Sequence, residues 1–150
     1  MKRTRWLILI VVLLLAACGA PIPTPTPAPT PTPTPGCASD AVTAYLDDLN
    51  VLTSEWDDAV AVAGNTGRGM LSPVVQDMQR IRRGVNELET PCAEADAVRD
   101  VVAEWMGHII DGYLSFMAQE SDGTVEQHFG KARTISGRMG DAYTALEVWQ

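Results

Sequence analysis

Residues 92–119 read CAEADAVRDVVAEWMGHIIDGYLSFMAQ, and this stretch decides the fold class. Its apolar side chains recur at steps of three and four, which is the spacing of one face of an α-helix. Thr90-Pro91 comes just before the stretch as a helix start signal. The pattern therefore predicts a helix from about Cys92 to Gln119, and we expect it to be the most buried helix of the domain. Its main face carries Val98, Val102, Trp105, Ile109, Tyr113 and Phe116, widened by Met106, Ile110, Leu114 and Met117.

Two further helices are predicted upstream of this stretch. The first covers residues 40–63, with Ser39 or Asp40 as its N-terminal cap. The glycine-rich loop 64–69 ends it, and Ser72-Pro73 offers a cap and a first-turn proline for the second helix. The second apolar stripe is narrow, as expected of a helix packed on one side only. The two stripes are Val42, Leu46, Leu49, Leu52, Trp56, Ala59, Val60 and Ala63, then Val74, Met78, Ile81, Val85 and Leu88.

A fourth helix is predicted after Ser121-Asp122-Gly123, which breaks the chain and offers another cap. Three glycines, Gly130, Gly137 and Gly140, lie within it and either allow a neighbouring helix to approach closely or mark a soft helix. Four amphipathic helices with short connections predict an all-α fold over residues 37–150, an antiparallel up-down-up-down four-helix bundle. The fourth stripe is Val125, Phe129, Ala132, Ile135, Met139, Ala142, Tyr143, Leu146 and Trp149.

The chain opens MKRTRWLILIVVLLLAAC, which has the layout of a secretory signal. A basic start precedes an apolar run, Trp6–Leu15, that is shorter than the roughly 20 apolar residues of a membrane span. Leu15-Ala16-Ala17-Cys18 resembles the lipobox of bacterial lipoproteins. That resemblance implies that residues 1–17 are a signal peptide. It also implies that Cys18 carries a diacylglycerol with palmitate-type acyl chains, which anchors the protein on the extracytoplasmic face of the cell membrane. The alternative is an ordinary secretory signal with an unmodified cysteine.

Residues 18–36 form a candidate tether between the lipidated cysteine and the helices. Proline occupies every second position from Pro21 to Pro35. Because proline fixes φ and lacks a backbone N–H, neither a helix nor a central strand can form here. We expect a disordered linker of polyproline II type, roughly 50 Å long at about 3.1 Å per residue. Such runs also resemble SH3 ligands, but an exported position favours a spacer, and its threonines are candidates for O-glycosylation.

Two cysteines remain once Cys18 is lipidated. An even pair in an exported chain predicts a disulfide between Cys37 and Cys92. In an up-down bundle the first and third helices start at the same end, so the bridge is geometrically reasonable. Free thiols and a thiolate metal site are the alternatives, although two cysteines fall short of the four ligands usual for zinc.

The composition is acidic, which limits the kinds of partner that the protein can bind. The formal charge is −8, and removal of residues 1–17 takes away three of the 11 basic residues and none of the 19 acidic ones, which gives −11. A domain this acidic is a poor binder of nucleic acid. Anionic lipid headgroups also repel it, so we expect membrane attachment to depend on the lipid on Cys18. One basic cluster, Arg80, Arg82 and Arg83, either pairs with Glu87 and neighbouring acids or binds an anionic partner.

The sequence holds two histidines, and neither predicts a strong metal site. His108 lies at helical spacing from Glu104 and Asp111, so all three can face one cation, but a solvated polar face is the simpler interpretation. His128 falls on the apolar side of the fourth helix, near its start, and is the weak metal candidate. We expect it at the edge of the core, satisfied by one hydrogen bond. No cofactor is expected.

Residues 92–119 also look like the helical domains of small bacterial lipoproteins of uncharacterised function. That resemblance implies a fold and a location. Because no catalytic motif is present, we expect a non-enzymatic binding or envelope-structure module with a possible protein partner in the envelope. The alternative is a metal- or small-ligand-binding bundle, with His128 and core methionines lining an interior site. The sequence leaves the oligomeric state open.

Overall fold

The computed structural model describes residues 37–149, and within that range it contains helices and no strand. The elements are α2 (Ser39–Gly64), the short 3₁₀ helix η1 (Arg68–Met70), α3 (Leu71–Glu87), α4 (Ala93–Met117) and α5 (Asp122–Glu147). The prediction of an all-α class with four long helices is confirmed for these residues. The predicted signal peptide, the lipid attachment at Cys18 and the tether over residues 18–36 lie outside the described residues.

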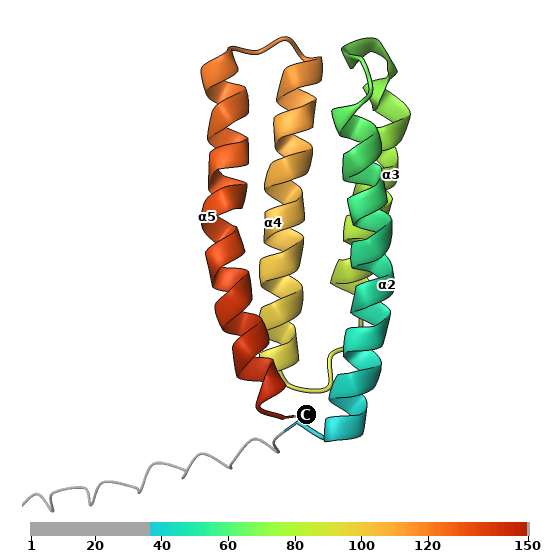
Figure 1. Ribbon diagram of the computed structural model, residues 1–150, viewed down its shortest axis with the longest axis vertical. Helices are drawn as coiled ribbons and strands as arrows, with labels where there is room; N and C mark the ends of the chain where they lie inside the picture. Colours follow the sequence, from blue (N-terminus) through green and yellow to red (C-terminus); the bar gives the residue numbers. More distant parts are fainter. Residues whose placement is uncertain (1–36, 150) are drawn as a thin grey trace, which may run out of the picture. The chain divides into compact units, whose positions relative to one another are not determined.

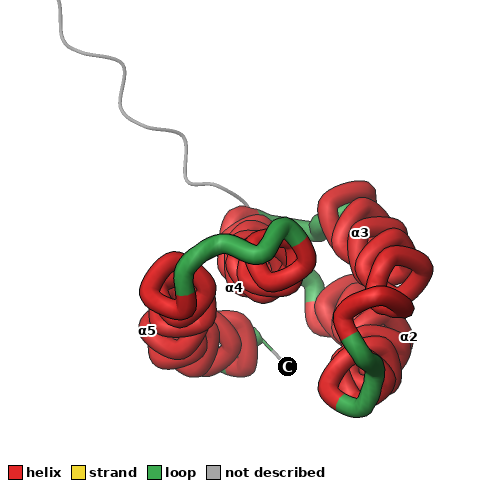
Figure 2. Tube along the Cα trace, turned by 90° about the horizontal axis from the view of Figure 1, so that it is seen from above, coloured by secondary structure: helices red, strands yellow, loops and turns green. Residues whose placement is uncertain are grey.

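The four long helices lie side by side (Figure 1). α4 packs against both α3 and α5, and α2 packs against α3. The α2–α3 and α4–α5 connections lie at one end, and the α3–α4 connection lies at the other end beside the start of α2 (Figure 1). Seen along their axes, α2 and α3 form one pair and α4 and α5 another (Figure 2). Within residues 37–149, no helix has both the length and the apolar character needed to cross a membrane.

α2 confirms the helix predicted over residues 40–63. The predicted cap is wrong, because the helix begins at Ser39 and Ala38 occupies the cap position. Asp40 instead lies in the first turn, where its carboxylate accepts a hydrogen bond from the backbone N–H of Ala41 at 3.0 Å. A negative charge there complements the positive end of the helix dipole. The buried residues of α2 are Val42, Tyr45, Leu49, Trp56, Ala59 and Ala63.

The predicted loop at 64–69 runs into η1, which leads directly into α3. The cap predicted at Ser72 is therefore wrong: Met70 holds that position, and Ser72 and Pro73 lie in the first turn. The proline is tolerated there because first-turn N–H groups have no partner within the helix. The Arg68 guanidinium lies 4.3 Å from the centroid of the Phe116 ring, a cation–π contact between η1 and α4. The buried residues of α3 are Leu71, Val75, Met78, Ile81 and Val85.

α4 is shorter than predicted at both ends. Cys92 is its cap residue, and Gln119 adopts a left-handed φ of 59° just beyond the C-terminal end. The prediction that α4 is the most buried helix is confirmed, since it has more buried residues than α2, α3 or α5. Its buried face is centred on Met106 and Ile110, whereas Trp105 is half-buried. The buried face differs from the predicted main face, which included Trp105, because α3 packs on one flank of α4 and α5 packs on the other.

α5 starts as predicted at a Ser121 cap, whose hydroxyl accepts a hydrogen bond from the backbone N–H of Thr124 at 3.2 Å. Its buried residues are Ala132, Ile135 and Leu146. The predicted stripe extends too far, because Trp149 lies beyond the helix and is 38% exposed. A Cβ built on Gly137 or Gly140 would meet no atom within 4 Å. Those two glycines therefore mediate no close helix contact, which leaves the soft-helix interpretation for them.

Candidate functional site

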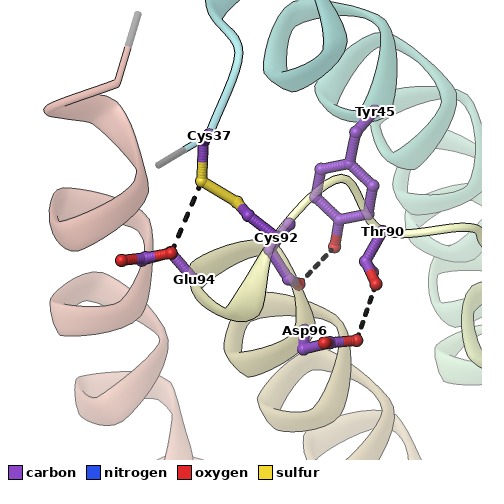
Figure 3. The surroundings of a disulfide bond; sticks show 7 residues. Cys37, Tyr45, Thr90, Cys92, Glu94 and Asp96 are labelled. Atoms are coloured by element: carbon purple, nitrogen blue, oxygen red, sulfur yellow. Dashed lines mark hydrogen bonds between the residues drawn. A yellow bond between two sulfur atoms is a disulfide. The ribbon is translucent and has the colours of Figure 1, made fainter. Parts of the chain in front are cut away.

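A disulfide joins Cys37 and Cys92, with Cα atoms 5.3 Å apart (Figure 3). Cys37 lies just before Ala38, the cap residue of α2, and Cys92 caps α4, so the bridge between cysteines 55 positions apart ties together the starts of two helices. The Cα separation lies within the usual 4.4–6.8 Å range of disulfides. Cys37 is 8% exposed, and its sulfur therefore lies in the core rather than at the surface.

Two hydrogen bonds hold the backbone around this bridge (Figure 3). The buried Tyr45 hydroxyl on α2 donates to the carbonyl oxygen of Ala95 on α4 at 3.1 Å. The Thr90 hydroxyl donates to the Asp96 carboxylate at 2.6 Å and so fixes the α3–α4 connection on the first turns of α4. Burial raises the pKa of the Tyr45 phenol well above its usual range, so this donor stays protonated.

The thiolate metal site that the sequence left as an alternative does not fit this geometry. The Cys37 sulfur lies 3.4 Å from a carboxylate oxygen of Glu94, and Cys92 completes the cluster. Cysteine binds a metal as the thiolate, but the sulfurs of Cys37 and Cys92 are bonded to each other. The cluster is therefore a structural clamp.

A second cluster brings together His108 and Asp111 on α4 and His128 on α5. One possible ligand atom from each residue lies within 4.8 Å of the other two. The two imidazole rings are 6.4 Å apart between centroids. His128 Nδ1 lies 4.0 Å from a carboxylate oxygen of Asp111. His108 and Asp111 are three positions apart and so share one face of α4, while His128 reaches this face from the neighbouring helix.

The environment of this cluster is partly closed. The Nδ1 atoms of His108 and His128 are both buried, and within the described residues neither has a hydrogen-bond partner. The Asp111 side chain is 52% exposed and forms the solvent-facing edge. A buried polar atom without a partner costs about 1–3 kcal/mol. Two such atoms in one cluster with a carboxylate make an arrangement in which a bound cation or water could supply the missing partners.

Close packing of α4 on α5 positions these three side chains. A Cβ built on Gly112 would lie 2.8 Å from the Phe129 ring, so only glycine leaves room for that ring. Phe129 also meets Tyr113 edge-on, with centroids 5.5 Å apart. Gly112 follows Asp111 in sequence, and Phe129 follows His128. The close contact between Gly112 and Phe129 therefore also fixes the distance between α4 and α5 at Asp111 and His128.

The structure changes the predicted histidine roles. Glu104, grouped by spacing with His108, instead forms an ion pair with Arg138 on α5 at 3.1 Å. His108 was expected on the wet face but is half-buried. His128 is at the core edge as expected, yet the hydrogen bond expected of it is missing at its buried Nδ1. Sequence reasoning missed the pairing of the two histidines because their distance depends on the register between α4 and α5. The one indirect signal was that both lie at similar distances along the chain from the α4–α5 turn.

Two of the three clustered arginines, Arg80 and Arg82, bind groups within the domain. Arg80 pairs with Glu55 at 3.1 Å and with Asp77 at 2.8 Å. Arg82 donates from Nε to the Ala103 carbonyl oxygen at 2.9 Å. The predicted pairing with neighbouring acids is confirmed for Arg80. A small cavity of about 260 Å³ lies beside the other two arginines. Its lining residues are Gln79, Arg82, Arg83, Asn86, Ile110, Asp111 and Leu114.

No protein-family model, curated protein or solved structure matches this chain.

Proposed function

We propose that this protein is a lipid-anchored, exported lipoprotein whose helical domain is a non-enzymatic binding or envelope-structure module. In this proposal the helices form an antiparallel up-down-up-down bundle, and Cys18 carries the lipid. The observation that carries it is the disulfide between Cys37 and Cys92. Disulfides persist in oxidising, extracytoplasmic compartments. The bridge also uses two of the three cysteines and leaves Cys18 as the odd one, at the position where the lipobox resemblance requires it.

The proposed topology is supported by the positions of the connections. The bridge links the starts of α2 and α4, and an up-down order brings these starts to the same end. Residues 19–36 then lead into the domain at that end. At roughly 3.1 Å per residue they allow the domain to reach about 50 Å from the bilayer. Such reach favours contact with a partner in the envelope rather than with the lipid surface, which would repel an acidic domain.

The anchor is tested by metabolic labelling with a palmitate analogue followed by membrane fractionation. We expect the full chain to incorporate label and to sediment with membranes, and the Cys18→Ala variant to lose the label. The matched control replaces Cys37 and Cys92 by alanine together, which removes the bridge but keeps the lipobox and should keep the label. Unlabelled wild-type protein would contradict the proposal.

The binding role is tested by crosslinking in native membranes and affinity capture of the full lipoprotein. We expect a captured envelope protein whose recovery falls when residues 20–35 are deleted, because the domain then no longer reaches it. Full recovery with the shortened tether would contradict the reach argument.

A further inference from the structure

We propose that His108, Asp111 and His128 bind one divalent transition-metal ion, of the zinc and copper class, between α4 and α5. This inference goes beyond the proposed binding module and does not depend on the lipid anchor. It also replaces the interior site of His128 and core methionines, since Met106 is fully buried in the core cluster while the three ligands open to solvent at Asp111.

The first support is distance. Protein ligands lie about 2.0–2.2 Å from zinc, so two ligand atoms of a tetrahedral site are roughly 3.4 Å apart. In the structure the three ligand atoms lie within 4.8 Å of one another. We expect side-chain rotation to bring these atoms to coordination distance. The helix spacing itself is set independently, by the contact between Gly112 and Phe129.

The second support is the state of the imidazole nitrogens. Two buried Nδ1 atoms lack a hydrogen-bond partner among the described residues, and the Asp111 carboxylate faces one of them at 4.0 Å. A cation coordinated through Nδ1 would give each of these nitrogens a partner and would compensate the carboxylate charge. No comparable gain comes from packing, because a buried polar atom that stays unpaired keeps its desolvation cost.

The donor set indicates the class of metal. Imidazole nitrogen favours zinc, copper, iron and nickel, whereas magnesium and calcium prefer oxygen ligands only. Two histidines and one carboxylate supply three ligands, one fewer than a closed structural zinc site has. The Asp111 side chain is 52% exposed, so water or an exogenous donor has access to the remaining position. The site is therefore suited to reversible binding.

The test is isothermal titration calorimetry of the full chain, purified with its disulfide intact and freed of metal with a chelator. Zn²⁺, Cu²⁺ and Ni²⁺ are titrated separately, with Mg²⁺ as the oxygen-preferring comparison. The variants are His108→Gln, His128→Gln and Asp111→Asn. Glu104→Gln is the matched control, because Glu104 lies one turn from His108 on the same helix but pairs with Arg138.

We expect one Zn²⁺ or Cu²⁺ per chain, with at least tenfold weaker binding in each histidine variant and unchanged binding in Glu104→Gln. Because the chain has two histidines and both lie here, their imidazole NMR signals should shift together on Zn²⁺ addition. Asp111→Asn changes a side chain that is 52% exposed, so we expect it to fold like the wild type and to bind Zn²⁺ more weakly, which keeps the proposal testable should a histidine variant unfold. Failure of all three transition metals to saturate, or undiminished binding by both His108→Gln and His128→Gln, would overturn the proposal.

Discussion

Gly137 and Gly140 should be replaceable by alanine with a gain in stability. Both lie within α5, both are exposed, and a Cβ at either position would meet no atom within 4 Å. Neither has a positive φ, so alanine adopts the same backbone without strain. The substitution therefore changes helix propensity and the freedom of the unfolded chain, and little else.

The magnitude follows from propensity alone. Glycine is about 0.8–1.0 kcal/mol less favourable than alanine in a helix interior. Each single variant should therefore raise the free energy of unfolding by about 1 kcal/mol, and the double variant by about 2 kcal/mol. In thermal terms about 1 kcal/mol corresponds to roughly 4 °C for a domain of this size.

The assay is urea unfolding of the full chain, followed by far-ultraviolet circular dichroism. The midpoint should rise while the slope stays constant, since the surface exposed on unfolding is unchanged. Gly112→Ala is the matched control, with the same chemistry in α4. There the new Cβ would lie 2.8 Å from the Phe129 ring, which is itself held edge-on by Tyr113. Overpacking costs about 1–3 kcal/mol, which cancels or exceeds the propensity gain.

One result would refute this reasoning. If Gly137→Ala and Gly140→Ala fail to stabilise the protein while Gly112→Ala does, then the open space lies in α4 and the close contact in α5, the reverse of the structure. A loss of stability in Gly137→Ala and Gly140→Ala would likewise contradict the open space around these two positions.

Three further outcomes are expected. Replacing Cys37 and Cys92 together by alanine should lower the free energy of unfolding by about 4 kcal/mol through loop entropy, measured by urea unfolding against the oxidised parent. Ser121→Ala should cost about 1 kcal/mol, because the Thr124 N–H loses its cap, and Ser121→Asp should restore most of it. Burial raises the folded pKa of Tyr45, while the unfolded phenol ionises near its ordinary value of about 10. The unfolded state then binds fewer protons than the folded state, so stability should fall as pH rises above about 10, and Tyr45→Phe should reduce that slope.

The helices were predictable because their buried side chains repeat with the period of an α-helix. Val42, Leu49 and Trp56 in α2, and Met78, Ile81 and Val85 in α3, follow the predicted stripes and are buried. The pairing of Cys37 with Cys92 was predictable because Cys18 was expected to carry a lipid, and the other two of the three cysteines then admit one intramolecular bridge. Both inferences depend on local spacing or on counting, and neither requires knowledge of how the helices face one another.

The features that could not be predicted from the sequence depend on how the helices pack against one another. α3 begins at Leu71, before the predicted Ser72 cap, because η1 leads directly into the helix and Met70 takes the cap position. Gly112 and Gly137 look alike in sequence, yet one touches a ring and the other faces open space. The meeting of His108 with His128 likewise depends on the register of α4 against α5, for which a single sequence holds no direct signal.

The bridge between Cys37 and Cys92 also determines how mechanical load passes through the domain. Residues 38–91, which hold α2 and α3, form a closed covalent loop whose two ends are fixed to each other. Tension that enters along the chain at Cys37, and is resisted by anything that grips α4 or α5, passes through the sulfur–sulfur bond directly into α4. The first two helices carry none of that tension. A pull along the chain at Cys37 would therefore load the α4–α5 pair, with the histidine cluster between its helices, while α2 and α3 keep their fold.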